Sequence, residues 1–280
     1  MNRSRAVLLW GLAVLWLLDG LLQLQPAMFT TALVQQIWAP VAQGNPGWLS
    51  GLVNGSIHLA SRHLVPFNAG IALIQFAIAA ALLSGRPRSV RIGIWGSLLF
   101  GLGVWVFGEG MGGVLTGGAS LLTGAPGSTF VYAVASGLLL VPSSCWRSLT
   151  VRLGIDPLQA VTGGLFLVGA FWQLAAPFWT PFGLSAPVAS NFNMSQPAPL
   201  RALIGAASGV GLAAPHITNL ALIVALAVAA VGVILVPDHV GVFAGTLALL
   251  LLLWLVGQDA GMLFTGTATD PSSRTRGRWQ

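Results

Sequence analysis

The chain has 280 residues, of which 55% are hydrophobic and 6% are charged, and its mean hydropathy is +0.84. A soluble domain carries about 25% charged residues, so this composition excludes a water-covered globular surface and predicts a surface that faces lipid. The net charge of +6 comes from arginine without any lysine. The arginines stand in short clusters between apolar runs, which is typical of membrane orientation signals and not of a nucleic-acid-binding surface.

Seven apolar runs are long enough, or nearly so, to cross a bilayer, which takes about 20 helical residues. They cover residues 6–25, 65–84, 91–108, 128–142, 160–177, 217–236 and 240–257. The first run follows Arg3 and Arg5 as in a signal peptide, but no A-x-A-like site follows it, so we expect an uncleaved first helix. The short run 128–142 fits either a span or a tilted, partly re-entrant helix.

The arginine clusters predict the orientation of the chain. Three clusters alternate with pairs of apolar runs, and they comprise Arg3 and Arg5, then Arg86, Arg88 and Arg91, then Arg147 and Arg152. Positive loops stay in the cytoplasm, so we expect a multi-pass protein of the inner (plasma) membrane with a cytoplasmic N-terminus. Seven helices place the C-terminus outside, which disagrees with the arginines of the tail. Either the tail overrides the rule or the helix count differs by one.

Two halves of the sequence match at a constant offset of 149 residues. The paired positions include Gly20 with Gly169, Pro66 with Pro215, Trp105 with Trp254, Gly108 with Gly257, and Thr116-Gly117 with Thr265-Gly266. Parallel repeats of an even number of helices keep one orientation. We therefore predict an all-α membrane protein of about seven transmembrane helices, built from two tandem four-helix repeats of which the second lacks its last helix. The first repeat covers 1–150, the second 151–266, and a polar tail 267–280.

Each repeat has a long outer segment after its first helix, at residues 26–64 and 178–216. Both segments contain proline, tryptophan and moderately apolar stretches. The stretch Gly47–His63 is predicted to form an amphipathic helix on the outer surface, with Trp48, Leu49, Leu52, Ile57 and Leu59 as its apolar contacts.

These features resemble a known family. The four-helix unit, the outer segment and a first helix reading Leu15-Trp-Leu-Leu-Asp-Gly-Leu-Leu-Gln-Leu-Gln-Pro-Ala-Met-Phe29 are similar to the DoxX/DoxD-like bacterial membrane modules. The stretches Glu109–Gly113 and Thr267–Pro271 are similar to uncharacterised duplicated bacterial membrane proteins. The resemblance covers most of the chain but brings no catalytic motif. It implies a membrane subunit that associates with quinone- or thiol-linked redox systems, with a quinone as cofactor and other membrane or redox subunits as partners.

Acidic residues are so few that each is a candidate functional group. Asp19 lies within the first apolar run, where burial of a charge is costly, and Gln23 follows one helical turn later. We interpret Asp19 as a residue that faces the bundle interior and pairs with Gln23. The alternative is that Asp19 reaches interfacial water.

Glu109 and Asp259 end matching helices and differ by one position in repeat register. A pseudo-twofold axis would place them around one outer opening, near His58, His63 and His216. The candidate outer-face polar site comprises Asp19, Gln23, His63, Glu109, His216 and Asp259. Such a set could hold a divalent metal. The alternative reading, which the absence of metal-ligand spacing favours, is that the carboxylates cap helix ends near lipid headgroups.

The glycine-rich stretch Gly108, Gly110, Gly112 and Gly113 matches G-x-G-x-x-G, but it follows a membrane helix and not a strand, which excludes a dinucleotide site. Gly108-x-x-x-Gly112 is instead interpreted as a close helix contact. The loop 107–127 around it fits either a cavity lining or a packed outer loop.

Three functions stay open at this point. The chain is a DoxX-like redox-associated subunit, a carrier for a small solute or ion, or a non-catalytic membrane scaffold. An enzyme acting alone is the least supported, because no nucleophile–base pair and no autonomous catalytic motif is visible.

Overall fold

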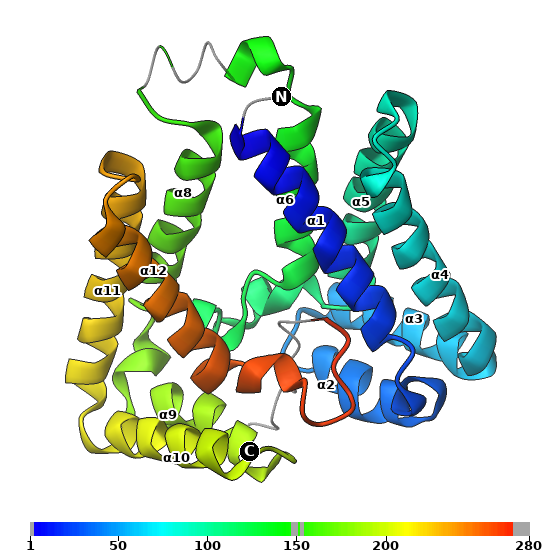
Figure 1. The fold of residues 1–280 in the computed structure, drawn as a ribbon. Helices are drawn as coiled ribbons and strands as arrows, with labels where there is room; N and C mark the ends of the chain where they lie inside the picture. The colour runs from blue at the N-terminus through cyan, green and yellow to red at the C-terminus, as the bar shows by residue number, and fades with distance from the viewer. Residues whose placement is uncertain (1–2, 147–150, 152–153, 271–280) are drawn as a thin grey trace. The chain divides into compact units, whose positions relative to one another are not determined.

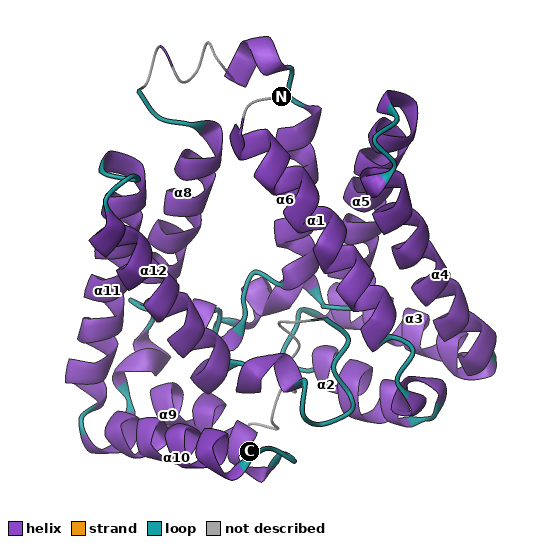
Figure 2. Ribbon diagram, viewed as in Figure 1, coloured by secondary structure: helices purple, strands orange, loops and turns teal. Residues whose placement is uncertain are grey.

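The computed structural model describes residues 3–146, 151 and 154–270. Every regular element in these residues is a helix, as Figures 1 and 2 show. Five helices are long and apolar enough to cross a membrane, namely Arg3–Leu22, Leu64–Leu83, Pro87–Phe107, Pro215–Leu235 and Val240–Gly257. These results confirm the all-helical class and agree with a membrane protein. The expected spans 128–142 and 160–177 form shorter apolar helices, Ser128–Leu140 and Pro157–Trp172.

The described chain divides into two compact units. Unit 1 comprises residues up to 116, residues 126–141 and residues from 261 onward, whereas unit 2 comprises residues 117–125 and 142–260. The chain passes from unit 1 into unit 2 between residues 141 and 142, and the division into repeats at residue 150 stays a prediction. Residues 117–125 and 261–270, however, each pack with the unit opposite to that of their neighbours in sequence.

Unit 1 is built on α1 (Arg3–Leu22), α3 (Gly47–Arg62), α4 (Leu64–Leu83), α5 (Pro87–Phe107) and α6 (Ser128–Leu140), with α2 (Ala39–Val41) as a short connection (Figure 1). Helix α1 packs on α4, α4 on α5, and α5 on α6. Arg5 connects the start of α1 to the end of α6, because its guanidinium donates hydrogen bonds to the carbonyl oxygens of Leu139 (2.8 Å) and Val141. The outward residues of these helices are apolar, with Leu73 69% and Ile92 70% exposed, as lipid contact requires.

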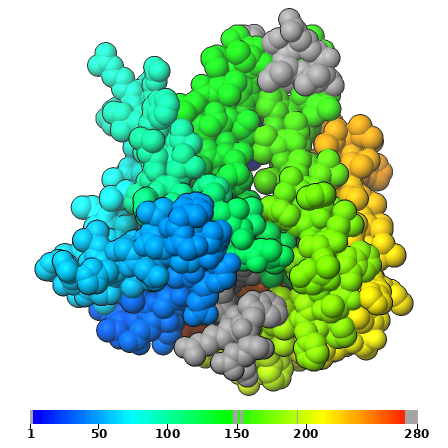
Figure 3. Space-filling view, turned by 180° about the vertical axis from the view of Figure 1, so that it is seen from behind, coloured from blue at the N-terminus to red at the C-terminus, as the bar shows by residue number. Residues whose placement is uncertain are grey.

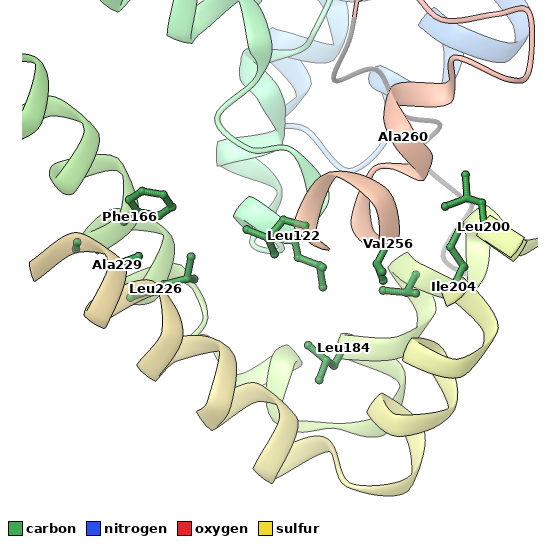
Figure 4. Packing of buried hydrophobic residues seen from close by; sticks show 13 residues of the cluster. Leu122, Phe166, Leu184, Leu200, Ile204, Leu226, Ala229, Val256 and Ala260 are labelled. Atoms are coloured by element: carbon green, nitrogen blue, oxygen red, sulfur yellow. The ribbon is translucent and has the colours of Figure 1, made fainter. Parts of the chain in front are cut away.

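Unit 2 is built on α8 (Pro157–Trp172), α9 (Pro181–Ser190), α10 (Ala198–Ala213), α11 (Pro215–Leu235) and α12 (Val240–Leu252), which continues as a π-helix over Leu253–Gly257. Helix α8 begins at a capping box, in which Asp156 accepts from the Leu158 N–H and Gln159 accepts from the Asp156 N–H. Its core is apolar and joins α8, α11 and the Leu121–Thr123 segment to the residues around Val256, as Figure 4 shows. The labelled members include Leu122, Phe166, Leu184, Ile204 and Leu226.

The outer segment of the first half contains the amphipathic helix that the sequence predicts at Gly47–His63, seen here as α3 (Gly47–Arg62). Leu49 and Val53 are fully buried against unit 1. Trp48 and Leu59 are 58% and 61% exposed, and the blue atoms of this part of the chain form part of the face seen in Figure 3. Helix α3 thus has an apolar side turned inward and further apolar side chains turned outward, which suits a helix at a membrane interface.

Candidate functional site

A buried carboxylate lies near the end of the first membrane helix. Asp19 stands in the last turns of α1 and is 1% exposed. The phenol hydroxyl of Tyr132, on α6, donates a hydrogen bond to Asp19 Oδ1 at 3.3 Å. An ionisable group at this depth is costly unless a partner or a proton satisfies it, so the pair is the first candidate for function. The expectation that Asp19 faces the interior of its bundle agrees with this position.

Further buried polar side chains surround the pair. The Trp16 indole N–H donates to Ser97 Oγ at 2.7 Å, and the Ser136 hydroxyl lies 2.7 Å from the same oxygen and 2.8 Å from the Tyr132 carbonyl oxygen. The Trp16 and Tyr132 rings meet edge to face with their centroids 5.0 Å apart. We call Asp19, Trp16, Ser97, Tyr132 and Ser136 the Asp19 network. It connects α1, α5 and α6 through the apolar core of unit 1.

Gln23 does not pair with Asp19 through its side chain, contrary to the interpretation from the sequence. The Gln23 backbone carbonyl instead accepts a hydrogen bond from the Asn68 side-chain amide at 2.9 Å. Unit 2 contains the same contact, in which the Asn219 amide donates to the Gln173 carbonyl at 2.9 Å. A carbonyl at a helix end has no hydrogen-bond donor within its own helix. Each asparagine therefore supplies a donor to a buried carbonyl oxygen that would otherwise have none.

Glu109 caps the start of another helix. Its Oε1 accepts from the Ser128 hydroxyl at 2.7 Å and from the Thr129 backbone N–H at 3.2 Å, at the N-terminus of α6. Glu109 also follows the C-terminus of α5, where the helix dipole opposes a negative charge, whereas the N-terminal dipole of α6 stabilises one.

The surroundings of Glu109 favour the protonated, uncharged form of its side chain. Burial, and next the charge of Asp270, raise the pKa of Glu109 to about 7, while the hydrogen bonds from Ser128 and Thr129 oppose the rise. Asp270 also interacts electrostatically with Asp19. Unit 1 therefore gathers three acidic side chains that repel one another, which favours binding of protons or cations over anions.

The glycine-rich stretch has a different role from the helix contact that Gly108-x-x-x-Gly112 suggested. Helix α5 ends at Phe107, and residues 110–113 take positive φ angles of 54°, 53°, 61° and 76°. A Cβ on Gly112 would lie 1.7 Å from the Pro126 carbonyl oxygen, so only glycine fits. The interpretation as a helix-packing motif is wrong, because these residues form a left-handed turn that lets the backbone pass close to 126–127.

A second left-handed turn follows α12. Residues 259–262 have φ angles of 50°, 51°, 65° and 59°, although only Gly261 is a glycine. Asp259 is 1% exposed, and neither of its carboxylate oxygens has a hydrogen-bond partner. Burial raises the pKa of Asp259 to about 6. Since Glu109 belongs to unit 1 and Asp259 to unit 2, the hypothesis that they share one outer opening stays a prediction.

The two histidines of the predicted outer-face site are surface residues. His63 and His216 are both exposed, and His216 lies against the ring of Trp179 with centroids 6.1 Å apart. In the residues that the structure describes, no group of three or more histidine, cysteine, aspartate or glutamate side chains is arranged to hold a metal ion. The predicted set therefore separates into a buried part, which includes Asp19, Gln23 and Asp259, and an exposed part.

Sequence reasoning missed Tyr132, Ser97, Ser136 and Asp270. A signal for the first was present, because Tyr132 is the only tyrosine in the chain and lies inside an apolar run with Ser136 one turn later. Hydroxyl groups at i and i+4 of a membrane helix share a face and point to an interior contact. Asp270 carried no such signal, because its proximity to Glu109 depends on the fold.

In comparisons with known proteins, no protein-family model, no curated protein and no solved structure matches this chain.

Proposed function

We propose that the chain is a duplicated membrane protein of seven transmembrane helices. The five long apolar helices would be joined by Ser128–Leu140 and Pro157–Trp172, tilted or locally thinning the bilayer. Three pairs of contacts support duplication. The amide of Asn68 matches that of Asn219, the two left-handed turns match each other, and the Thr116 hydroxyl bonds to Gly113 O at 2.8 Å as Thr265 does to Met262 O at 2.7 Å. Reporter fusions that place the N-terminus inside and residue 270 outside would support this count, and two termini on one side would reject it.

For the activity, we propose a carrier of a small solute or ion that is coupled to protonation of Asp19. The observation that carries this proposal is the Asp19–Tyr132 hydrogen bond within a candidate membrane span. A carboxyl group at this depth changes its charge only by taking up or releasing a proton, and its ionised form needs a nearby positive charge. Transporters use such groups to connect the binding of a solute to the movement of an ion.

A purely structural role explains Asp19 poorly. In unit 2 the residue four positions before Gln173, as Asp19 is four positions before Gln23, is Gly169, which packs against Leu121. This alignment on the two glutamines has an offset of 150 residues, one more than the offset of 149 that pairs Gly169 with Gly20. Phe166 takes the place that Trp16 has in unit 1, and it is buried in an apolar core. A helix of the same kind therefore packs without a carboxylate, and the polar network of unit 1 is an addition to the shared architecture.

The test uses membrane vesicles from cells that express the full chain. A panel of labelled amino acids, organic acids and inorganic ions is offered with and without an imposed pH gradient. We expect at least one solute to accumulate when the gradient is present, and Asp19→Asn to abolish the accumulation. The exposed Asp238→Asn serves as the matched control. Absence of any gradient-driven uptake, or full uptake by Asp19→Asn, would reject the proposal.

A quinone-linked subunit, as the DoxX-like resemblance implies, is the second candidate. The observation in its favour is that the Tyr132 hydroxyl and the Trp16 indole N–H lie in an apolar, aromatic surrounding that includes Phe100, whose ring centroid is 5.6 Å from that of Trp16. A quinone would take over these donors from their present acceptors, Asp19 and Ser97, for its own carbonyl oxygens, and it would supply the redox chemistry that the protein itself does not. Solvent extraction of the purified protein should then release about one quinone per chain, and extraction without quinone would exclude this function.

A further inference from the structure

The end of α12 presents a carboxylate on an unusual backbone. The π-helix Leu253–Gly257 ends the membrane helix, and the left-handed turn of residues 259–262 follows at once. The Asn191 side-chain amide donates to the carbonyl oxygens of Val256 (3.2 Å) and Gly257 (3.1 Å), which holds the chain just before the turn. Non-glycine residues with positive φ are strained, and such strain persists where the surrounding structure enforces it, often at functional sites.

The Asp259 carboxylate has no partner in this environment. The side chain is 1% exposed, and both oxygens are buried without a hydrogen bond. Glu109, which precedes the equivalent turn of unit 1, receives the Ser128 hydroxyl and the Thr129 N–H. The first repeat thus supplies a helix N-terminus to its carboxylate, whereas Asp259 has no such group.

Within the part of the chain that the structure describes, the helices packed around the end of α12 bring no positive side chain to this carboxylate. Helices α9 and α10 and the Leu121–Thr123 segment pack against Leu253–Gly257, and the only charged residue on these elements or on α12 is Arg201. Arg201 is exposed, and its guanidinium lies 3.4 Å from the Met194 carbonyl oxygen. Burial alone raises the pKa of Asp259 to about 6, so above neutral pH an ionised carboxylate without a counter-charge would lie in the interior.

We propose that Asp259 binds a small monovalent cation in unit 2. A carbonyl oxygen lies nearby: a Cβ on Gly257 would be 1.9 Å from the Leu122 carbonyl oxygen, so that carbonyl comes close to the backbone two residues before Asp259. Carboxylate and carbonyl oxygens suit hard cations. One positive charge neutralises one carboxylate, whereas a divalent ion would leave a net charge in a buried apolar setting, which is why the site selects a monovalent ion.

This site does not depend on the proposed carrier function. Asp19 belongs to unit 1 and Asp259 to unit 2, so the two carboxylates can be tested separately. Asp19→Asn should leave cation binding by Asp259 intact. Conversely, if the Asp259→Asn variant still takes up solute, the carrier proposal is unaffected. The cation site is then tested only by the cation-binding measurement described next.

The experiment measures the melting temperature of the full chain in lipid nanodiscs. Chloride salts of lithium, sodium and potassium are compared with N-methylglucamine chloride at equal ionic strength and about pH 8, where the carboxylate is ionised. A ligand that binds only the folded state raises the melting temperature, and at about ten times its dissociation constant we expect a rise of about 3 °C with at least one alkali cation. At about pH 5 a proton occupies the carboxylate, so the rise should disappear.

The variants decide whether Asp259 is responsible. Asn tolerates positive φ, so Asp259→Asn keeps the backbone, removes the unpaired charge and should melt at the same temperature in all salts. Asp238→Asn, in an exposed turn, should keep the cation dependence. If Asp259→Asn does not fold, the wild-type titration still decides, because a bound cation gives a saturable rise. The proposal would be overturned if the wild type melted at the same temperature in every salt, even if that temperature changed with pH. It would also be overturned if Asp259→Asn kept the cation dependence.

Discussion

The Tyr132 hydroxyl lies 3.3 Å from Asp19 Oδ1, and this contact joins residues that are 113 positions apart in the sequence. It connects α1 to α6 within unit 1, and it lies at a carboxylate that is 1% exposed. The Asn68 contact has a counterpart at Asn219 in unit 2, whereas the Asp19–Tyr132 contact belongs to unit 1.

The first prediction concerns the pair itself. Tyr132→Phe removes the hydroxyl while keeping the ring, so Asp19 loses its donor, and we expect unit 1 to lose about 1–3 kcal/mol of unfolding free energy. Asp19→Asn alone should cost less, since it removes the carboxylate that needs the donor. In a double-mutant cycle measured by thermal unfolding in nanodiscs, the two changes should be non-additive. Additive effects would show that the hydroxyl and the carboxylate do not interact.

The second prediction concerns the contact that both units share. Asn68→Ala and Asn219→Ala each leave a buried helix-end carbonyl without its donor, and each should cost about 1–3 kcal/mol. Hydrogen exchange should locate the losses, with faster exchange near residues 23–29 in the first variant and near 173–179 in the second. Asn54→Ala, on the exposed side of α3, is the control and should change neither region. Exchange that increases equally in both regions for one variant would contradict separate contacts.

The sequence predicts the helical class well, because long apolar runs with few charges have one physical explanation. Asp19 could be singled out for the same reason, since a lone charge in an apolar run is conspicuous. Its partner could not, because hydrogen-bond geometry across 113 residues is set by how helices pack and not by local pattern. For the glycines of residues 108–113, the local pattern led to a wrong prediction. Their spacing fits helix contact, yet the helix ends at Phe107, and the glycines serve a left-handed turn.

The third prediction concerns the pH dependence of unit 1. Burial and Asp270 raise the pKa of Glu109 from 4.5 to about 7, so the folded state holds this proton more tightly than the unfolded chain does. The resulting stabilisation is fully present below about pH 4.5 and is lost as the pH rises through about 7, with a total of roughly 3 kcal/mol. The melting temperature should therefore fall between about pH 5 and 8.

Glu109→Gln tests this assignment, since glutamine does not titrate and Glu109 is the only glutamate in the chain. The variant should have a flatter melting profile than the wild type over the same pH range and should be the more stable of the two at about pH 8. Asp270→Asn removes the repulsion and should shift the wild-type transition toward lower pH. A Glu109→Gln profile that superposes on the wild-type profile would assign the pH dependence to another group.

The fourth prediction concerns the left-handed turn of unit 1. At Gly112, with φ of 61°, an added Cβ would lie 1.7 Å from the Pro126 carbonyl oxygen, and no flexible side chain is available to yield. Gly112→Ala should therefore destabilise unit 1 by at least about 2 kcal/mol, since both the backbone conformation and the close approach are lost. Gly137→Ala is the matched control, because Gly137 lies within α6 and a Cβ there meets nothing within 4 Å. Alanine propagates a helix better than glycine by about 1 kcal/mol, so the control should be neutral or stabilising. Thermal unfolding of both variants decides the question: a Gly112→Ala protein as stable as Gly137→Ala would mean that the chain does not pass Pro126 as closely as described.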